Sequence, residues 1–255
     1  MHPVLFSIGP ITIRTFGLII SLAFILGAVV ATSLARKENL DPLKIIDLCF
    51  YILLSAIFGS HIFYVIQNYG FFHLFSLEIF KIWKGGLVFY GGLISATVTV
   101  VLYLKIHHMS FWKTSDIFAF GFALGGAVGR WACFSAGCCY GKPTNLPWGI
   151  VYTHPWTFAP KGISLHPSPV YESAANLLIF LVLIIFRKRK RFDGQLFLLS
   201  IGLYSIFRFG LEFLRGDDRG HFLLPSFSTP QTFSVLILIT TIVATILVRR
   251  AKLAG

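Results

Sequence analysis

The sequence predicts an all-α integral membrane protein with seven transmembrane helices. Of its 255 residues, 56% are hydrophobic and only 13% are charged, and the mean hydropathy is +0.77. Average soluble domains carry about 25% charged residues. The hydrophobic residues also fall in long blocks that short polar connectors separate. These two observations exclude a soluble globular domain.

Seven segments are apolar enough to cross a bilayer, which takes roughly 20 residues of helix. They lie at about 12–35, 44–67, 86–106, 115–135, 168–186, 193–213 and 229–248. No cleavable signal peptide is apparent in the opening MHPVLFSIGPITIR, so the first span is expected to act as the targeting signal. We expect residues 1–255 to form a single polytopic membrane domain.

The basic residues predict the orientation of these spans. The formal net charge is +12, and 13 of the 22 Lys and Arg residues lie in four short connectors or tails. These are Arg36, Lys37 and Lys44; Lys105 and Lys113; residues 187–191; and Arg249, Arg250 and Lys252. With seven spans, all four clusters fall on one side, which the positive-inside rule makes cytoplasmic. The N-terminus is therefore expected outside and the C-terminus in the cytoplasm, and nucleic acid is not expected as a partner.

Three longer segments then lie on the outer side. Residues 68–85 are aromatic with few charges, which predicts a helix lying in the membrane interface. Residues 136–167 are rich in Gly and Pro, which suggests an ordered loop at the membrane surface, and residues 214–228 carry several charges.

Ionisable residues gather in the outer half of the predicted membrane. Arg130 lies near the outer end of the fourth span, and Glu172 begins the fifth. Arg208 and Glu212 lie near the outer end of the sixth span at i, i+4 spacing, so they share one helix face, and Arg215 is expected on that face too. Tyr90 begins the third span, and Arg14 lies at the outer edge of the first.

This arrangement is suited to a phosphate headgroup. A charge at the centre of a membrane helix costs about 2.5–3.5 kcal/mol, so such residues are typically functional. Arg makes paired, charge-assisted hydrogen bonds to phosphate oxygens. Structural alternatives remain open for each residue: an intrahelical pair for Arg208 and Glu212, snorkelling for Arg130, a helix cap for Glu172, and an aromatic anchor for Tyr90.

The four cysteines allow several interpretations. Cys49 lies within the second span, and Cys133, Cys138 and Cys139 follow one another closely at the end of the fourth. Small, buried free thiols are the usual state of such residues, and an extracytoplasmic disulfide is an alternative. The chain has no pair of CxxC units, and the spacing supplies too few ligands for a typical metal site. No metal or other cofactor is expected.

Five motifs in order along the chain resemble the phosphatidylglycerol–prolipoprotein diacylglyceryl transferase family. They are IGPITIRTFGLI, GGLVFYGGLI, GRWACFSAGCCYGKPT, LHPSPVYE and FRFGLEFLRGD. The resemblance implies a bacterial inner-membrane enzyme whose partners are phosphatidylglycerol, prolipoprotein signal peptides with a lipobox cysteine, and membrane lipids. It would move diacylglycerol from phosphatidylglycerol to the cysteine thiol, release glycerol 1-phosphate and need no cofactor.

The resemblance also implies roles for residues. Arg130 falls on the family's phosphatidylglycerol-binding arginine, Arg208 and Glu212 on its essential pair, and Gly141 on its motif glycine. Arg215 follows that pair, and Glu172 closes the well-kept LHPSPVYE motif.

The chain departs from the family pattern at several positions. Tyr90 stands where the family usually has His, and Phe16 where it usually has Tyr. Cys133 and Cys138 stand where Asn and Glu are usual. We expect Arg208, Glu212 and Tyr90 to be catalytic, and Arg130, Arg215, Gly141, Glu172 and Phe16 to bind substrate. Two alternatives remain: the same scaffold and lipid donor with a different acceptor, or a non-enzymatic lipid-binding or transport protein.

Overall fold

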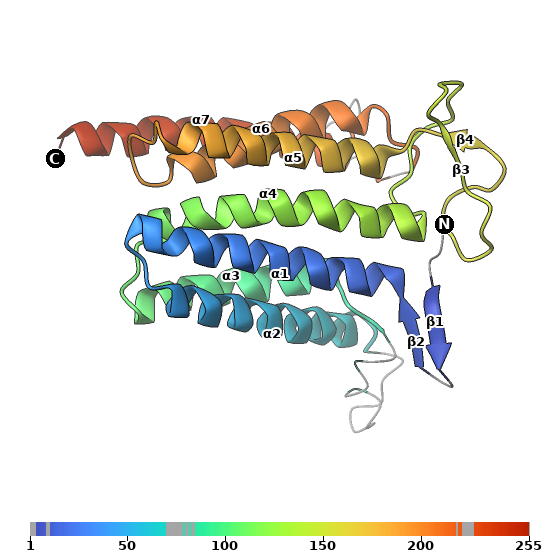
Figure 1. Ribbon diagram of the computed structural model, residues 1–255, viewed down its shortest axis with the longest axis horizontal. Coiled ribbons are helices and arrows are strands. Elements are labelled where there is room, and N and C mark those ends of the chain that lie inside the picture. Colours follow the sequence, from blue (N-terminus) through green and yellow to red (C-terminus); the bar gives the residue numbers. More distant parts are fainter. Residues whose placement is uncertain are drawn as a thin grey trace. The chain divides into compact units, whose positions relative to one another are not determined.

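Seven α-helices account for most of the part of the chain that the structure describes. The computed structural model describes residues 4–8, 11–69, 79, 82, 85–217, 219–220 and 227–254. The helices are α1 (Thr15–Ala35), α2 (Pro42–Gln67), α3 (Phe89–Ile106), α4 (Phe111–Ala136), α5 (Ser168–Arg187), α6 (Gln195–Glu212) and α7 (Thr229–Ala254), with a 3-10 helix, η1, at Arg36–Glu38 (Figure 1). One α-helix overlaps each of the seven predicted spans.

Four short strands accompany the helices. β1 (Val4–Ile8) pairs antiparallel with β2 (Ile11–Arg14) directly before α1. β3 (Ile150–Val151) pairs antiparallel with β4 (Ser164–Leu165) inside the segment that connects α4 to α5. The connection predicted at 136–167 is thus ordered by backbone pairing.

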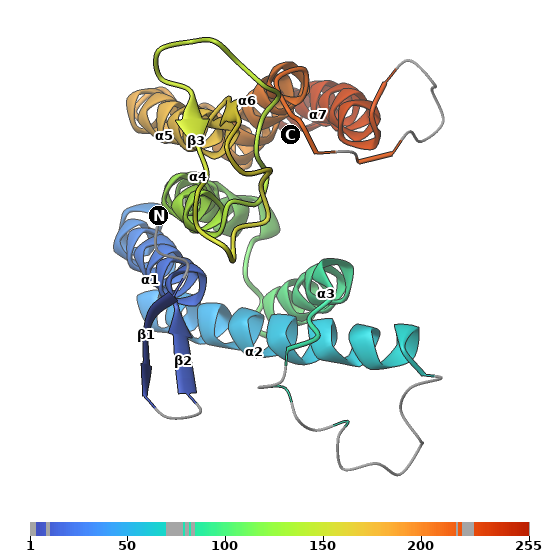
Figure 2. The ribbon, with the colours of Figure 1, turned by 90° about the vertical axis from the view of Figure 1, so that its right-hand side faces the viewer.

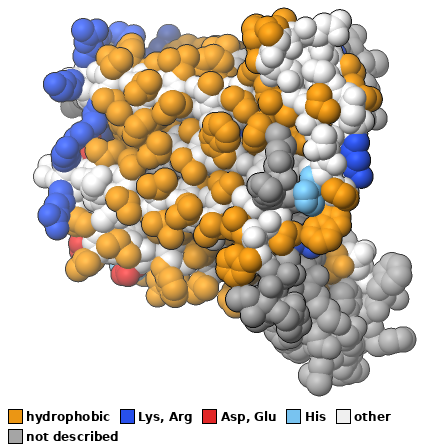
Figure 3. Space-filling model, turned by 45° about the vertical axis from the view of Figure 1, so that its right-hand side comes forward, with side chains coloured by type: hydrophobic (Ala, Val, Ile, Leu, Met, Phe, Trp, Pro, Cys, Tyr) orange, Lys and Arg blue, Asp and Glu red, His pale blue; other side chains and the backbone are white. Residues whose placement is uncertain are grey.

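Six of the helices, all except α6, are long and apolar enough to cross a membrane. Arg208 and Glu212 lower the mean hydropathy of α6, which is 18 residues long. Many large hydrophobic side chains face outward, as expected of a surface that contacts lipid, and they cover the helical face seen in Figure 3. The helical membrane class is therefore supported, and the seven-span count and the orientation of the termini stay predictions.

The chain divides into two compact units, residues 1–31 with 115–255, and residues 32–114. In the second unit, α2 and α3 pack antiparallel at small residues. A Cβ atom added to Gly91 would clash with the Gly59 carbonyl oxygen, and one added to Gly92 would lie 3.0 Å from the Ala56 carbonyl oxygen. Glycine at these positions therefore permits the close approach of the two helices.

In the first unit, α5, α6 and α7 lie side by side and α4 packs against α5 and α6 (Figures 1 and 2). α1 approaches α4 where Gly27 faces Gly121, since a Cβ atom added to Gly27 would lie 3.0 Å from the Gly121 carbonyl oxygen. The C-terminal end of α4, the start of α5, the end of α6 and the start of α7 lie at one end of this bundle.

A buried carboxylate fixes the opposite end of the bundle. Asp116 of α4 accepts hydrogen bonds from the backbone N–H groups of Gly194 (2.8 Å) and Phe197 (2.9 Å), at the start of α6. The Nζ atom of Lys190 lies 3.1 Å from the same side chain. The first N–H groups of a helix have no partner within the helix, so Asp116 caps α6 from a neighbouring helix.

Two predicted outer segments are only partly described. The interfacial helix expected at 68–85 lies almost wholly outside the described residues, of which this segment contributes 68, 69, 79, 82 and 85. Within 214–228, residues 218 and 221–226 also lie outside them.

Candidate active site

A buried cluster of arginines and carboxylates lies at the end of the first unit where α4 ends and α5 begins. Arg130 comes from the last turns of α4, Glu172 from the second turn of α5, and Arg208 and Glu212 from the last turns of α6. Arg215 follows α6. The structure therefore brings together five of the eight residues that the sequence predicted.

Glu172 is the centre of this cluster and is only 3% exposed. Its Oε1 atom accepts a 2.6 Å hydrogen bond from Arg215 Nη1 and lies 3.5 Å from Arg208 Nη1. Its Oε2 atom lies 2.7 Å from Arg130 Nε. The alternative interpretation of Glu172 as a helix cap is wrong, because the first turn of α5 contains no acidic residue. Glu172 instead holds three arginines together.

Arg208 and Glu212 form the ion pair that their spacing predicts. Arg208 Nη2 lies 2.8 Å from Glu212 Oε2, and both residues are buried. The other carboxylate oxygen of Glu212 accepts a 2.9 Å hydrogen bond from the Ser228 hydroxyl, just before α7. Glu212 thus fixes the position of Arg208 and ties α6 to the start of α7.

Arg215 does not share the helix face of Arg208, and that expectation is wrong. α6 ends at Glu212, and Arg215 forms an isolated antiparallel bridge with Gly141. Lys142 N donates a 2.8 Å hydrogen bond to the Leu214 carbonyl. This backbone pairing, rather than helical periodicity, directs the Arg215 side chain toward Glu172.

Position 141 requires glycine because the surrounding atoms leave no room for a side chain. A Cβ atom at this position would lie 2.5 Å from His166 Cβ and 2.6 Å from the Ser168 hydroxyl oxygen. Its backbone N–H donates a 3.0 Å hydrogen bond to the His166 carbonyl. Gly141 therefore joins three segments, those that carry Glu172, Arg215 and the end of α4.

Asp217 and Arg219 extend the cluster, and the sequence analysis did not select them as site residues. Arg215 donates to both carboxylate oxygens of Asp217 from Nε and Nη2, each at 2.9 Å, and Arg219 Nε donates at 2.9 Å. Burial raises the pKa of Asp217, but the hydrogen bonds and charges of Arg215 and Arg219 outweigh it and hold that pKa below its ordinary value. The RGDDR run was the available signal, but Asp217 is two residues from both Arg215 and Arg219, a spacing at which helical side chains do not face each other.

Among the described residues, the cluster has one more positive group than negative groups. It contains four guanidinium groups (Arg130, Arg208, Arg215 and Arg219) and three carboxylates (Glu172, Glu212 and Asp217). The buried Nη1 atom of Arg208 lies 3.5 Å from Glu172 Oε1, but among the described residues it makes no hydrogen bond. A buried donor that makes no hydrogen bond costs about 1–3 kcal/mol. An anion beside Arg208 would remove this cost and balance the charge.

An apolar groove leads away from the cluster. It has a volume of about 380 Å³ and is lined by α4, α5 and α6, with Arg130, Asn176 and Tyr204 among mostly apolar side chains such as Phe122 and Ile179. The cluster and the groove together offer a polar, positive end and an apolar extension, as an anionic amphiphile requires.

Two predicted residues remain, Phe16 in the first unit and Tyr90 in the second. Phe16 lines a separate cavity of about 840 Å³ with Arg14, Cys138, Trp156 and Phe158. Tyr90 belongs to the second unit, in the first turn of α3, and its side chain is 64% exposed.

These features define a class: multi-pass helical membrane proteins with a buried arginine–carboxylate site beside an apolar groove. Residues 3–247 match the family model for prolipoprotein diacylglyceryl transferase. The chain belongs to this family. It is 38% identical to a phosphatidylglycerol–prolipoprotein diacylglyceryl transferase of Finegoldia magna, over 95% of this chain and 94% of that protein. Proteins of the same name from Clostridioides difficile (34% identity; 86% and 85% covered) and Listeria innocua (33%; 99% and 91%) are also similar.

Proposed function

We propose that this protein transfers the diacylglyceryl group of phosphatidylglycerol to the lipobox cysteine thiol of a prolipoprotein. The products are a thioether and glycerol 1-phosphate. The names of its relatives support this activity. The observation that carries it is the buried cluster, in which three arginines surround Glu172 and Arg208 Nη1 makes no hydrogen bond among the described residues.

The phosphate of the lipid is proposed to lie at Arg208 and Arg130. The guanidinium groups of both residues form ion pairs with the Glu172 carboxylate. Arg130 also lines the apolar groove. An acyl chain in that groove would place the phosphate beside Arg130. Gly141 and Arg215 serve this site indirectly, since their backbone bridge orients the Arg215 guanidinium against Glu172.

The reaction requires stabilisation of a leaving phosphate. The substrate thiolate attacks the carbon of the diacylglyceryl group that bears the phosphate. An S–C bond forms there while the C–O bond to the phosphate breaks, and its electron pair leaves with glycerol 1-phosphate. Arg208 and Arg130 stabilise the charge that grows on the phosphate. Glu212 positions Arg208 through their 2.8 Å ion pair.

Tyr90 and Phe16 are proposed to act on the prolipoprotein, which is the acceptor substrate. Tyr90, which stands where the family usually has His, is proposed as a catalytic residue that acts on the acceptor thiol. Phe16 lines the cavity that Cys138 and Trp156 share, which is wide enough for an apolar peptide segment.

We further propose seven spans in a bacterial inner membrane, with the N-terminus and the active site on the outer side. In the first unit, the cluster lies at the end of the bundle opposite Lys190 and Asp116, and the positive-inside rule makes the Lys190 end cytoplasmic. A C-terminal fusion to green fluorescent protein should fluoresce in cells, and one to alkaline phosphatase should be inactive. The reverse pattern would contradict this orientation.

The activity is tested with the purified chain in phosphatidylglycerol liposomes and a lipobox peptide. We expect the peptide to gain the mass of one diacylglyceryl group, with stoichiometric release of glycerol phosphate. Arg208→Ala should lower the rate by about 10²–10³-fold, the range for loss of one charge-stabilising donor. Arg250→Ala, at the exposed end of α7, is the matched control. No mass gain with the unaltered chain would overturn the proposed function.

A further inference from the structure

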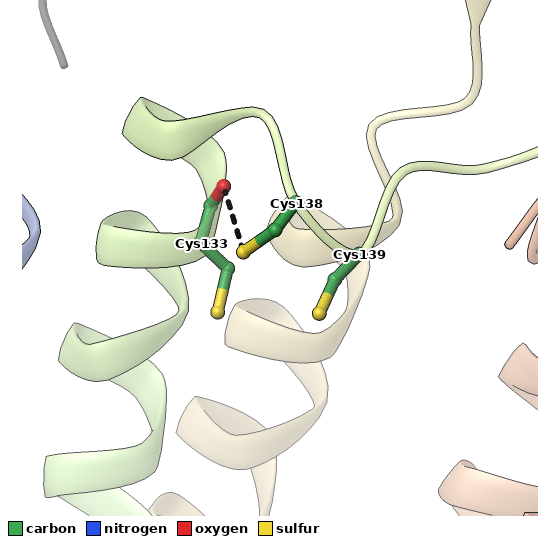
Figure 4. A group of neighbouring side chains, drawn as sticks. All are labelled: Cys133, Cys138 and Cys139. Carbon is green, nitrogen blue, oxygen red and sulfur yellow. Dashed lines mark hydrogen bonds between the residues drawn. The ribbon is translucent and has the colours of Figure 1, made fainter. Parts of the chain in front are cut away.

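Three cysteine sulfur atoms converge where α4 ends. Cys133 lies on the last turns of α4, and Cys138 and Cys139 lie in the turn that follows it (Figure 4). All three Sγ atoms lie within 4.8 Å of one another. Spacing in the sequence did not indicate this site, because the turn after α4 creates it.

The backbone of the turn places these sulfur atoms. Gly137 adopts φ +70°, and Cys139 adopts φ +61°, a left-handed conformation that non-glycine residues rarely take. The Cys138 N–H donates a 3.1 Å hydrogen bond to the Cys133 carbonyl, and the Cys138 thiol donates to the same oxygen at 3.7 Å. The chain therefore reverses so that all three thiols lie on the same side of α4.

The separation of the sulfur atoms suits one metal ion. Three atoms within 4.8 Å of one another always have a common point no more than about 2.8 Å from each, and a Zn–S bond is about 2.3 Å long. Shifts of about half an ångström would therefore complete three bonds. A disulfide joins only two sulfur atoms at about 2.05 Å and would leave the third thiol without a role.

A positively charged group lies beside one of the three sulfur atoms. Arg219 Nη2 donates a 3.5 Å hydrogen bond to Cys139 Sγ. Three thiolates with a divalent ion carry one net negative charge, and the Arg219 guanidinium lies beside one of these sulfur atoms.

The buried side chain of Tyr152 packs against the turn. Tyr152 is 1% exposed. A Cβ atom added to Gly137 would lie 3.1 Å from the Tyr152 ring. Among the described residues its hydroxyl has no hydrogen-bond partner. A water or hydroxide as fourth ligand of a metal ion would give this hydroxyl an acceptor.

We propose that Cys133, Cys138 and Cys139 bind one thiophilic divalent metal ion of the Zn²⁺ class, as three thiolates. Binding releases the thiol protons and involves no oxidation. Cys138 lines the cavity that also contains Arg14 and Phe16, which gives an ion a path to the site. The ion would fix the turn between α4 and Gly141, and Gly141 in turn bridges to Arg215. The site is thus structural support for the arginine cluster.

The test uses the full-length chain, purified under reducing, metal-free conditions and titrated with Cd²⁺, whose bonds to thiolates absorb in the near ultraviolet. We expect one Cd²⁺ per chain with this absorption. We expect each of the substitutions Cys133→Ser, Cys138→Ser and Cys139→Ser to weaken Cd²⁺ affinity by about tenfold or more. Loss of a residue that only supports a metal ligand already lowers metal affinity by about tenfold. Cys49→Ser, on α2 in the other unit, is the matched control and should bind normally.

A second measurement keeps the proposal testable if these variants do not fold. Alkylation of the unaltered chain, followed by mass spectrometry, should show Cd²⁺ protecting all three cysteines, with the protection lost on chelation. Equal alkylation with and without Cd²⁺ would overturn the proposal. So would unchanged binding by Cys139→Ser, or a disulfide among the three cysteines in protein taken directly from membranes.

Discussion

Arg215 Nη1 donates a 2.6 Å hydrogen bond to Glu172 Oε1, across 43 residues of sequence. Both side chains are buried, so neither charge is screened by water. Removing one partner of a buried ion pair leaves the other charge uncompensated, which costs about 3–5 kcal/mol. This contact therefore links the integrity of the site to the packing of α5 against the segment after α6.

Glu172→Gln should reduce transferase activity strongly. The amide keeps the shape of the side chain but removes the charge that holds Arg130, Arg208 and Arg215. Hydrogen bonds to charged groups contribute about 1.5–3 kcal/mol, so we expect kcat/KM to fall by about 10–100-fold. The liposome assay measures this, with Glu38→Gln on η1 as the matched control. Unaltered activity would show that the cluster does not need the carboxylate.

Gly141→Ala should destabilise the protein and lower its activity. The new Cβ atom would lie 2.5 Å from His166 Cβ, so the bridge to Arg215 must shift. Overpacking of this kind costs typically about 1–3 kcal/mol. Thermal unfolding in detergent measures the loss. Gly210→Ala has nothing within 4 Å of its new Cβ atom and lies within helix α6, so it should not lower stability. Equal unfolding temperatures for the two variants would contradict the steric argument.

Asp116→Ala should lower stability without changing the chemistry. It removes the acceptor of the Gly194 and Phe197 N–H groups at the start of α6, and loss of a helix cap costs about 0.5–2 kcal/mol. The site lies at the other end of α6, so activity per folded molecule should be unchanged. The unfolding temperature and the amount of folded protein test this. Asp193→Ala, a 42% exposed partner of Lys190, should have a smaller effect.

The stability of the site should depend on pH through Asp217. Its folded-state pKa lies below the ordinary value of 3.8, so its stabilising contribution is present above that value and is lost as the pH falls through the lowered pKa. Thermal unfolding of the unaltered chain measured from neutral to acidic pH should show this loss. Asp217→Asn should be less stable at neutral pH, and the difference between the two should shrink toward acid. A constant difference would contradict the linkage.

The sequence by itself determined the membrane class, the seven helical segments and the residues that carry charge into them. Hydropathy is a property of contiguous segments, and a helix makes its backbone hydrogen bonds within one segment. The membrane class and the helical segments can therefore be predicted from the local sequence. The pairing of Arg208 with Glu212 was predictable for the same reason, since both lie on one helix at i, i+4 spacing.

Only the tertiary structure decided how these residues meet. The central position of Glu172, the return of Arg215 through Gly141, the contribution of Asp217 and the convergence of Cys133, Cys138 and Cys139 all depend on turns and on pairing between distant segments. Helical or strand periodicity in the sequence does not predict such contacts. A backbone bridge or a residue in the left-handed conformation sets the direction of a side chain, whatever the spacing of that residue along the sequence. The sequence therefore shows which charged residues are present. The packing of the helices and turns decides which arginines contact the same carboxylate.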